Sequence, residues 1–372
     1  MNIFIYAEDL AISTSSVPAR EMLRELITIR TDDKFSLVFR KGSEKSGWAL
    51  EYLATLPSDR ISTHVLPRSR RESNLRALLG LSPASDNRLP ADIYLRFDAG
   101  LLGPIAHPLI ALVADMSVFD SDQASLAWHG RRLYKRALQT TAAHADKIVA
   151  ISETTRIALL QRYPASTDRV VVIHNGVAAQ WFQEIVPNHS NSSPYWVWYG
   201  QMTARKNLPG LLMAYAKVRD EGHPLPRLKL VGKPGYGGAT ILNDIRELGL
   251  VACVDVIEPL PLPELVALVA ESHGLVFPSF QEGFGMPIVE AMALGRPVLT
   301  SNTTAMPEVS GGHAILVDPS DIQSIADGLA SLQDPTLFNV QKIAARRRWA
   351  SRFTVQAAAA AYSQLIDSVI QK

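Results

Sequence analysis

One stretch, residues 276–295, places strong limits on the fold of this chain. It opens with an apolar run that ends at Pro278, and it closes at Gly295 after a helix-forming segment. A short apolar run of this kind is typical of an interior parallel strand. Pro287 suits the first helical position, where its missing N–H costs nothing, and Gly295 suits the left-handed residue that ends a helix. The stretch therefore predicts a buried strand, a loop and a short helix.

The rest of the chain repeats this alternation of short apolar strands and amphipathic helices. In the first half we expect strands at residues 3–6, 35–39, 64–66, 93–97, 109–113, 147–151 and 170–173, and helices at 17–29 and 134–145. In the second half we expect strands at 195–199, 228–231, 254–257 and 298–300, and helices at 208–219, 241–248, 264–271, 322–333 and 354–370. Such alternation favours parallel sheets with right-handed crossovers. The aromatic strand at 195–199 suits plain core packing, with a ligand-binding aromatic box as the alternative.

Length and composition fit an ordinary globular protein of two domains. The chain has 372 residues, of which 47% are apolar and 20% charged. A formal net charge of +1 predicts no overall attraction to nucleic acid or to a membrane surface. The single cysteine, Cys253, excludes an intrachain disulfide and fits a reducing cytoplasm. No apolar run reaches membrane-spanning length, and the first residues lack the pattern of a signal peptide. The polar segment at 187–194, bracketed by prolines, is the clearest linker.

Two carboxylates and two glycines mark the loop of the 276–295 stretch. Gly283 and Gly285 allow bare backbone to approach a ligand, and a helix start with free N–H groups suits a phosphate. Glu282 lies in a strand-to-helix loop at the carboxyl edge of the expected sheet, where open α/β folds bind ligands. Glu290 is expected in the first helical turn, where it either contacts a ligand or simply complements the helix dipole.

This loop resembles the signature of the retaining family-four glycosyltransferases. The resemblance rests on Glu282, seven intervening residues that include Gly-Phe-Gly-Met-Pro, and then Glu290-Ala-Met. It implies the GT-B fold, in which two Rossmann-like domains with parallel sheets face each other across a cleft. The first domain would span residues 1–186 and the second 195–353. The last helix, within 354–372, would cross back to the first domain.

The resemblance also implies roles for the residues around the loop. Arg205 and Lys206, just before a probable helix cap at Asn207, would grip the nucleotide diphosphate and neutralise charge on the departing group. Glu290 would hold the ribose hydroxyls, and Glu282 would position a hydroxyl of the transferred sugar without acting as a nucleophile. The backbone of the loop and helix start would serve sugar and phosphate: Gly283, Phe284, Gly285, Met286 and Pro287.

A second glycine-bearing loop begins at Gly232, after the expected strand at 228–231. By resemblance Gly232 lies beside the nucleotide and Lys233 reaches phosphate, while a flexible surface turn is the alternative. Glu258, where a glycine is frequent in relatives, is placed to accept N–H groups from guanine, or is simply exposed near a turn.

The first half departs from the family pattern at one point. Ala114 stands where many relatives have a histidine, while the neighbouring Asp115 is retained. Asp115 either orients an acceptor hydroxyl or caps its own loop. The candidates that would substitute for the histidine are His107, His129 and His174. The glycine pair often found after the first strand is replaced by Ser13-Thr14-Ser15-Ser16, which would bind acceptor or phosphate, or cap a helix.

Three clusters of basic residues are present. Arg68, Arg70 and Arg71 form one, and Arg131, Arg132, Lys135 and Arg136 form another. They either lie on ordinary surface helices or contact an anionic lipid or a diphosphate-linked acceptor. The third cluster, Arg346-Arg347-Arg348, is interpreted as a solvated hinge before the last helix.

These features predict a retaining, metal-independent hexosyltransferase that uses a nucleotide-diphosphate sugar as donor substrate and needs no cofactor. No Asp-x-Asp pair suits a sugar-nucleotide metal site. The leading donor is GDP-mannose, with a UDP-sugar second, and the acceptor is a saccharide or lipid-linked saccharide in polysaccharide biosynthesis. Nucleic acid is not expected as a partner. The expected location is the cytoplasm, with peripheral contact at the inner face of the membrane. The rivals are a non-catalytic GT-B protein that binds a sugar nucleotide, and an epimerase acting on the sugar nucleotide.

Overall fold

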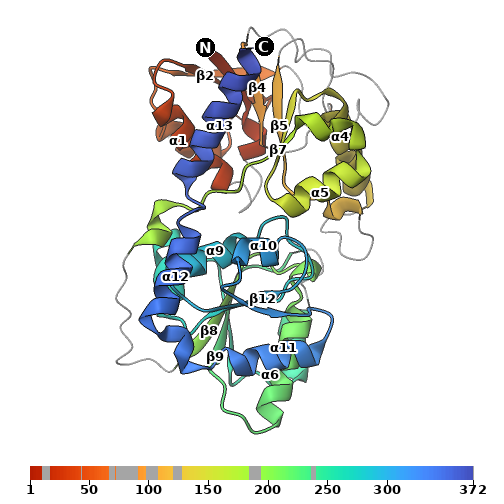
Figure 1. Cartoon of the computed structure of the whole chain (residues 1–372), viewed down its shortest axis with the longest axis vertical. Helices are drawn as coiled ribbons and strands as arrows, with labels where there is room; N and C mark the ends of the chain where they lie inside the picture. Colours follow the sequence, from red (N-terminus) through yellow and green to blue (C-terminus); the bar gives the residue numbers. More distant parts are fainter. Residues whose placement is uncertain are drawn as a thin grey trace. The chain divides into compact units, whose positions relative to one another are not determined.

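The computed structural model describes residues 1–10, 17–42, 44–66, 72, 91–97, 108–119, 128–183, 194–235 and 240–371 (Figure 1). Several positions singled out above lie outside these residues: Ser13–Ser16, Arg68, Arg70, Arg71, His107, residues 187–193 of the linker, and the side chain of His129. Contacts divide the described chain into two compact units. One comprises the residues up to Gly176 together with those from Val355 onward, and the other runs from Val177 to Thr354. The domain limits given above remain a prediction.

The first unit is built on a parallel seven-stranded sheet in the order β3-β2-β1-β4-β5-β6-β7. Its strands are β1 Asn2–Tyr6, β2 Lys34–Arg40, β3 Ile61–Leu66, β4 Ile93–Arg96, β5 Leu109–Val113, β6 Lys147–Ala150 and β7 Val170–Val172. Its helices are α1 Val17–Ile29, α2 Gly47–Ala54, α4 Trp128–His144, α5 Glu153–Arg162 and α13 Val355–Ile370, with 3-10 turns η1 Ala7–Leu10, η4 Ser117–Phe119 and η5 Pro164–Arg169.

Both faces of this sheet are buried, which explains why its strands are almost continuously apolar. Successive side chains of a strand point to opposite faces. Ile3 and Ile5 belong to the core cluster that includes α1 and α13, whereas Phe4 and Tyr6 belong to the cluster that includes Leu138 of α4. Parallel strands covered on both sides need apolar residues at every position.

The last helix, α13, packs against α1 in the first unit, as the resemblance implied (Figure 1). Ala358 and Ala359 are buried there, so the small side chains of the alanine run allow close packing. Arg30, which follows α1, donates to Asp367 at 2.9 Å and to the hydroxyl of Ser363 at 2.8 Å. Apolar packing and a charge-assisted contact therefore both hold the chain's end on the first sheet.

The second unit is built on a parallel six-stranded sheet in the order β10-β9-β8-β11-β12-β13. Its strands are β8 Tyr195–Tyr199, β9 Arg227–Val231, β10 Val254–Ile257, β11 Leu275–Phe277, β12 Val298–Ser301 and β13 Ile315–Val317. Its helices are α6 Leu208–Asp220, α7 Ile241–Glu247, α8 Leu262–Glu271, α9 Met286–Ala293, α10 Met306–Ser310, α11 Ile322–Ser331 and α12 Val340–Ala350, with 3-10 turns η6 Ala179–Phe182, η7 Ala204–Lys206 and η8 Pro335–Phe338.

The aromatic strand β8 lies in the core of this sheet. Trp196 and Trp198 are fully buried. The ring of Trp196 meets Tyr215 edge-on at 6.3 Å, and Trp198 stacks on Phe277 at 6.5 Å. The core-packing interpretation is thus confirmed for these two side chains, and the aromatic-box alternative is wrong for them.

The predicted hinge at Arg346–Arg348 is wrong. These residues lie inside α12, and the Arg346 side chain is buried. Its guanidinium donates to the carbonyl oxygens of Gly295 at 3.0 Å and Leu337 at 2.5 Å. Burial lowers the pKa of Arg346 to about 10, and repulsion from Arg296 acts in the same direction. The buried cation stabilises the left-handed turn that ends α9.

Removing this buried guanidinium should destabilise the second unit. We expect Arg346→Ala to lower the free energy of unfolding by about 2 to 4 kcal/mol, because one buried and one partly buried carbonyl oxygen lose their donor. Arg348→Ala, an exposed change on the same helix, should alter it by less than about 0.5 kcal/mol. Urea unfolding followed by tryptophan fluorescence measures both, and equal effects would contradict the structural role of Arg346.

Candidate functional site

The candidate site lies at the carboxyl edge of the second sheet. In a parallel sheet the loops after all strands leave from the same edge, where open α/β folds bind ligands. The loop after β8 carries Arg205 and Lys206, and the loop after β11 carries Glu282 and leads into α9. The structure therefore brings together three predicted residues that are separated by about 80 positions in the sequence.

Glu282 is a buried carboxylate held between two cations. Its side chain is 7% exposed; one oxygen accepts from Lys206 Nζ at 2.5 Å and the other from Arg205 at 2.8 Å. Lys206 is itself buried and lies 4.6 Å from the centre of the Phe277 ring. Burial would raise the pKa of Glu282, but the charges of Arg205 and Lys206 lower it to about 2. Glu282 is therefore fully ionised at neutral pH.

The two loops are fixed to each other by backbone contacts. Phe280 N donates to Arg205 O at 2.9 Å, and the Arg205 guanidinium donates to Gln281 O at 2.9 Å. The backbone N–H of Glu282 donates to the hydroxyl of Thr304, which has the unusual φ of 53°. These contacts hold the carboxylate in one position, and Thr304 is a supporting residue that sequence reasoning missed. The Ser/Thr-rich run after the expected strand at 298–300 was the available signal.

Asn207 occupies the cap position before α6, as predicted, but its side chain does not make the cap hydrogen bond. Its backbone adopts the left-handed region with φ 54°, and no cap bond from its side chain is present. The side-chain amide instead donates to Pro278 O at 3.1 Å and to Pro319 O at 2.7 Å. Asn207 thus joins the loops after three strands, and it suits the left-handed region better than most residues do.

Glu290 lies in the second turn of α9, so the predicted position in the first turn is wrong. The dipole explanation loses its basis, because the effect of the dipole is confined to the terminal turn. The Glu290 carboxylate accepts from the hydroxyl of Tyr199 at 2.7 Å. Burial raises the pKa of Glu290 to about 7, and the hydrogen bond from Tyr199 opposes this only in part. Tyr199, stacked on Trp181 at 5.9 Å, was also missed.

The start of α9 has the backbone geometry of an anion site. Gly285 is the residue before the helix, with φ 97° in the left-handed region that favours glycine. The helix begins at Met286, so Pro287 is its second residue rather than the predicted first, although it still lies in the first turn. Phe284 is buried and meets Phe353 edge-on at 5.6 Å, so its side chain is part of the hydrophobic core. Gly283 lies between Glu282 and Phe284 in the same loop.

The fold itself requires a glycine at position 232, apart from any contact with a ligand. It has φ 157°, and a Cβ there would lie 1.9 Å from Gly200 O, so only glycine fits where the loops after β8 and β9 meet. Lys233 and Glu258 are exposed and form an ion pair with each other at 3.6 Å. Their predicted roles toward phosphate and base remain predictions.

Asp115 lies in the first unit, directly after β5. Its carboxylate accepts from the backbone N–H of Ser117 at 2.9 Å and from the Ser117 hydroxyl at 2.5 Å. This is the loop-capping arrangement weighed above. The role toward an acceptor remains a prediction.

Comparison with known proteins agrees with this geometry. A family model described as "Glycosyl transferases group 1" matches residues 193–334, and one described as "Glycosyltransferase Family 4" matches residues 119–181. The first match contains both carboxylates and both cations of the site. The chain belongs to the family-four glycosyltransferases, a retaining family.

The O-antigen chain mannosyltransferase B of Escherichia coli is 31% identical to this glycosyltransferase over 212 residues, covering 55% of the chain and 56% of the relative. Across the curated relatives, the chain spans 54 to 66% of their length. Among solved structures, the sucrose-phosphate synthase of Thermosynechococcus elongatus has a TM-score of 0.75 at 18% identity, covering 100% of this chain and 99% of that one. The Anabaena protein Alr3699/HepE, in complex with UDP-glucose, has a TM-score of 0.73 at 17% identity and covers 99% and 100%. The fold is GT-B.

The described residues form neither a cluster suited to a metal ion nor a helix suited to a membrane. No three His, Cys, Asp or Glu side chains in this part of the glycosyltransferase gather in a way that could hold a metal ion. None of its described helices is long and apolar enough to cross a bilayer. The metal-independent mechanism stays a prediction.

The raised pKa of Glu290 predicts a specific pH dependence of stability. A carboxyl with a folded pKa of about 7 and an unfolded value near 4.5 keeps its proton longer in the folded state. The free energy of unfolding should therefore fall as pH rises from about 4.5 to 7, by up to about 3 kcal/mol. Glu290→Gln should remove this fall, while Glu247→Gln, an exposed change on α7, should keep it. Urea unfolding at several pH values tests this, and an unchanged profile in Glu290→Gln would contradict it.

Proposed function

We propose that this glycosyltransferase moves mannose from GDP-mannose to a saccharide or lipid-linked saccharide, with retention of the anomeric configuration. The observation that carries the proposal is the buried Glu282 carboxylate between Lys206 and Arg205, next to the start of α9. The mannosyl donor is supported by the 31% identity to an O-antigen mannosyltransferase. A UDP-sugar is the alternative donor.

In this proposal the diphosphate binds between the cations and the start of α9. Backbone N–H groups at a helix N-terminus favour phosphate, as do the fork of Arg205 and the compact charge of Lys206. The three side chains Arg205, Lys206 and Glu282 together carry a net charge of +1 before donor binds. The cations stabilise the charge that develops as the bond between the sugar C1 and the phosphate oxygen breaks.

Glu282 acts by position rather than as a base. A carboxylate with a pKa of about 2 is too weak a base to take a proton near neutral pH. It is well suited to accept a hydrogen bond from a hydroxyl of the transferred sugar. The acceptor oxygen then attacks C1 on the face that the diphosphate leaves, and its proton passes to the departing phosphate oxygen. Glu290, beside Tyr199, accepts from the ribose hydroxyls.

The remaining predicted residues take supporting roles in the proposal. Gly232 and Lys233 lie beside the nucleotide, Glu258 meets the base, and Asp115 orients the acceptor hydroxyl. The reaction needs no metal ion, because Arg205 and Lys206 supply the positive charge. The proposed location is the cytoplasm, at the inner face of the membrane when the acceptor is lipid-linked.

Two substitutions test the roles of the charged group. Lys206→Ala should weaken donor binding about 10- to 100-fold, because a charge-assisted contact to phosphate is worth about 1.5 to 3 kcal/mol. Glu282→Gln keeps the shape of the side chain and should lower the rate of donor turnover about 100-fold with a smaller effect on binding. Arg246→Ala, an exposed cation of α7, is the matched control and should change neither.

Thermal-shift titration with GDP-mannose, UDP-glucose and UDP-galactose measures binding, and nucleoside diphosphate release measures turnover. The proposal expects GDP-mannose to give the largest shift. Equal turnover in Glu282→Gln and wild type would indicate a non-catalytic sugar-nucleotide binder. A change of the donor into its epimer without acceptor would indicate an epimerase.

A further inference from the structure

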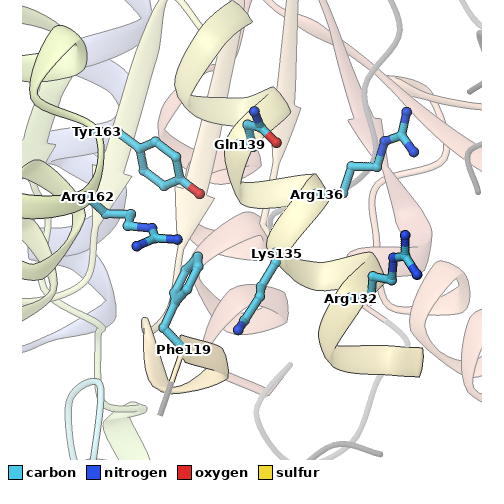
Figure 2. Close-up of a pocket in the computed structure, with 7 residues that line it drawn as sticks. All are labelled: Phe119, Arg132, Lys135, Arg136, Gln139, Arg162 and Tyr163. Atoms are coloured by element: carbon cyan, nitrogen blue, oxygen red, sulfur yellow. The ribbon is translucent and has the colours of Figure 1, made fainter. Parts of the chain in front are cut away.

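The first unit contains a pocket of about 710 Å³ that the proposed transfer reaction does not use (Figure 2). Four cationic residues line it: Arg132, Lys135, Arg136 and Arg162. Phe119, Gln139 and Tyr163 complete the lining. Its volume is in the range of small-molecule sites, and none of the lining residues that the structure describes is a carboxylate.

The pocket follows from the pattern of α4. Positions 132, 135, 136 and 139 fall on one face of a helix, since residues three and four apart are neighbours. The opposite face carries Ala137 and Thr141, which are buried in the first unit. Arg162 and Tyr163 come from the end of α5, and Phe119 is the last residue of η4. Helix α4 and the end of α5 thus supply the cationic side chains of the pocket, and η4 supplies an aromatic ring.

The positive charge of this pocket is not neutralised by the described part of the chain. None of its four cations forms an ion pair with a described carboxylate. Nearby arginines do have partners. Arg156 on α5 is paired with Glu153 at 2.6 Å, and Arg169 donates to the last carbonyl oxygens of α4. The pocket cations therefore differ from structural arginines of the same unit.

Aromatic rings hold two of the cations in place. Lys135 Nζ lies 4.9 Å and Arg162 Cζ 4.7 Å from the centre of the Phe119 ring. Figure 2 shows Lys135 and Arg162 on either side of this ring, while the heads of Arg132 and Arg136 extend outward from α4. Cation–π contacts stabilise like charges near one another without cancelling them. The two cations therefore keep their positive charge for an incoming anion.

We propose that this pocket binds the phosphate or diphosphate group of a second ligand, apart from the nucleotide sugar. Several cations with arginine forks match phosphate oxygens, and the Tyr163 and Gln139 side chains add further polar contacts. The source is either a free phosphorylated molecule or an anionic lipid headgroup, because both present the same group.

The test measures the binding of pyrophosphate to the whole chain by calorimetry. It compares the wild type with a pocket double variant and a control double variant. Lys135→Gln combined with Arg162→Gln should weaken binding at one site at least tenfold, and this loss should grow at low ionic strength. The control combines Arg246→Gln and Arg348→Gln, which remove the same charge from exposed positions of the second unit. The control and wild type should bind alike. The melting temperatures of the wild type and both double variants should agree within about 3 °C, because surface changes of this kind have small effects on stability.

The Lys206→Ala variant, which lacks a cation of the donor site, distinguishes pyrophosphate binding at this pocket from binding at the donor site. Pyrophosphate binding that survives in Lys206→Ala and is lost in the pocket variant supports the proposal, whatever the fate of the transferase proposal. Flotation with phosphatidylcholine vesicles, with or without phosphatidylglycerol, identifies the source. Binding to the anionic vesicles that the pocket variant loses assigns a lipid headgroup, and its absence assigns a free phosphorylated molecule. Unchanged pyrophosphate binding in the pocket variant, or an equal loss in the control, would overturn the proposal.

Discussion

The site of the second unit depends on the burial of one charge between two others. A carboxylate taken out of water costs several kcal/mol, and Glu282 recovers this only through Lys206 and Arg205. The same contacts join the loops after β8 and β11, so the electrostatic group is also a structural clamp. These three side chains together carry a net charge of +1 near the start of α9, where the backbone favours an anion. Architecture and electrostatics therefore favour the same class of ligand.

Two glutamates eight positions apart in one short segment have opposite electrostatic environments. Cations lower the pKa of Glu282, and burial beside a neutral tyrosine raises the pKa of Glu290. One carboxyl is permanently ionised, while the other changes charge near neutral pH. A family signature alone treats both as conserved acids, and the difference appears only when their neighbours from β8 and η7 are in place.

Local patterns were sufficient for most strands and for the central loop, because buried parallel strands and the Gly285 and Gly295 positions carry strong sequence signals. Helix α12 escaped detection because its buried position is filled by Arg346, whose charge resembles a solvated surface in a sequence pattern. The cap position of Asn207 was predictable, but its side-chain bonds to two other loops were not, because a cap and a bridge between loops use the same residue type. Tyr199 and Thr304 act through partners about 90 and 20 positions away, which no local pattern shows.

The most direct measurement is a crystal structure of the chain with bound nucleotide sugar. We predict that the diphosphate lies within hydrogen-bond distance of Lys206 Nζ and the backbone N–H of Met286, with the sugar against Glu282. A diphosphate bound elsewhere, with no contact to Lys206, would contradict the account.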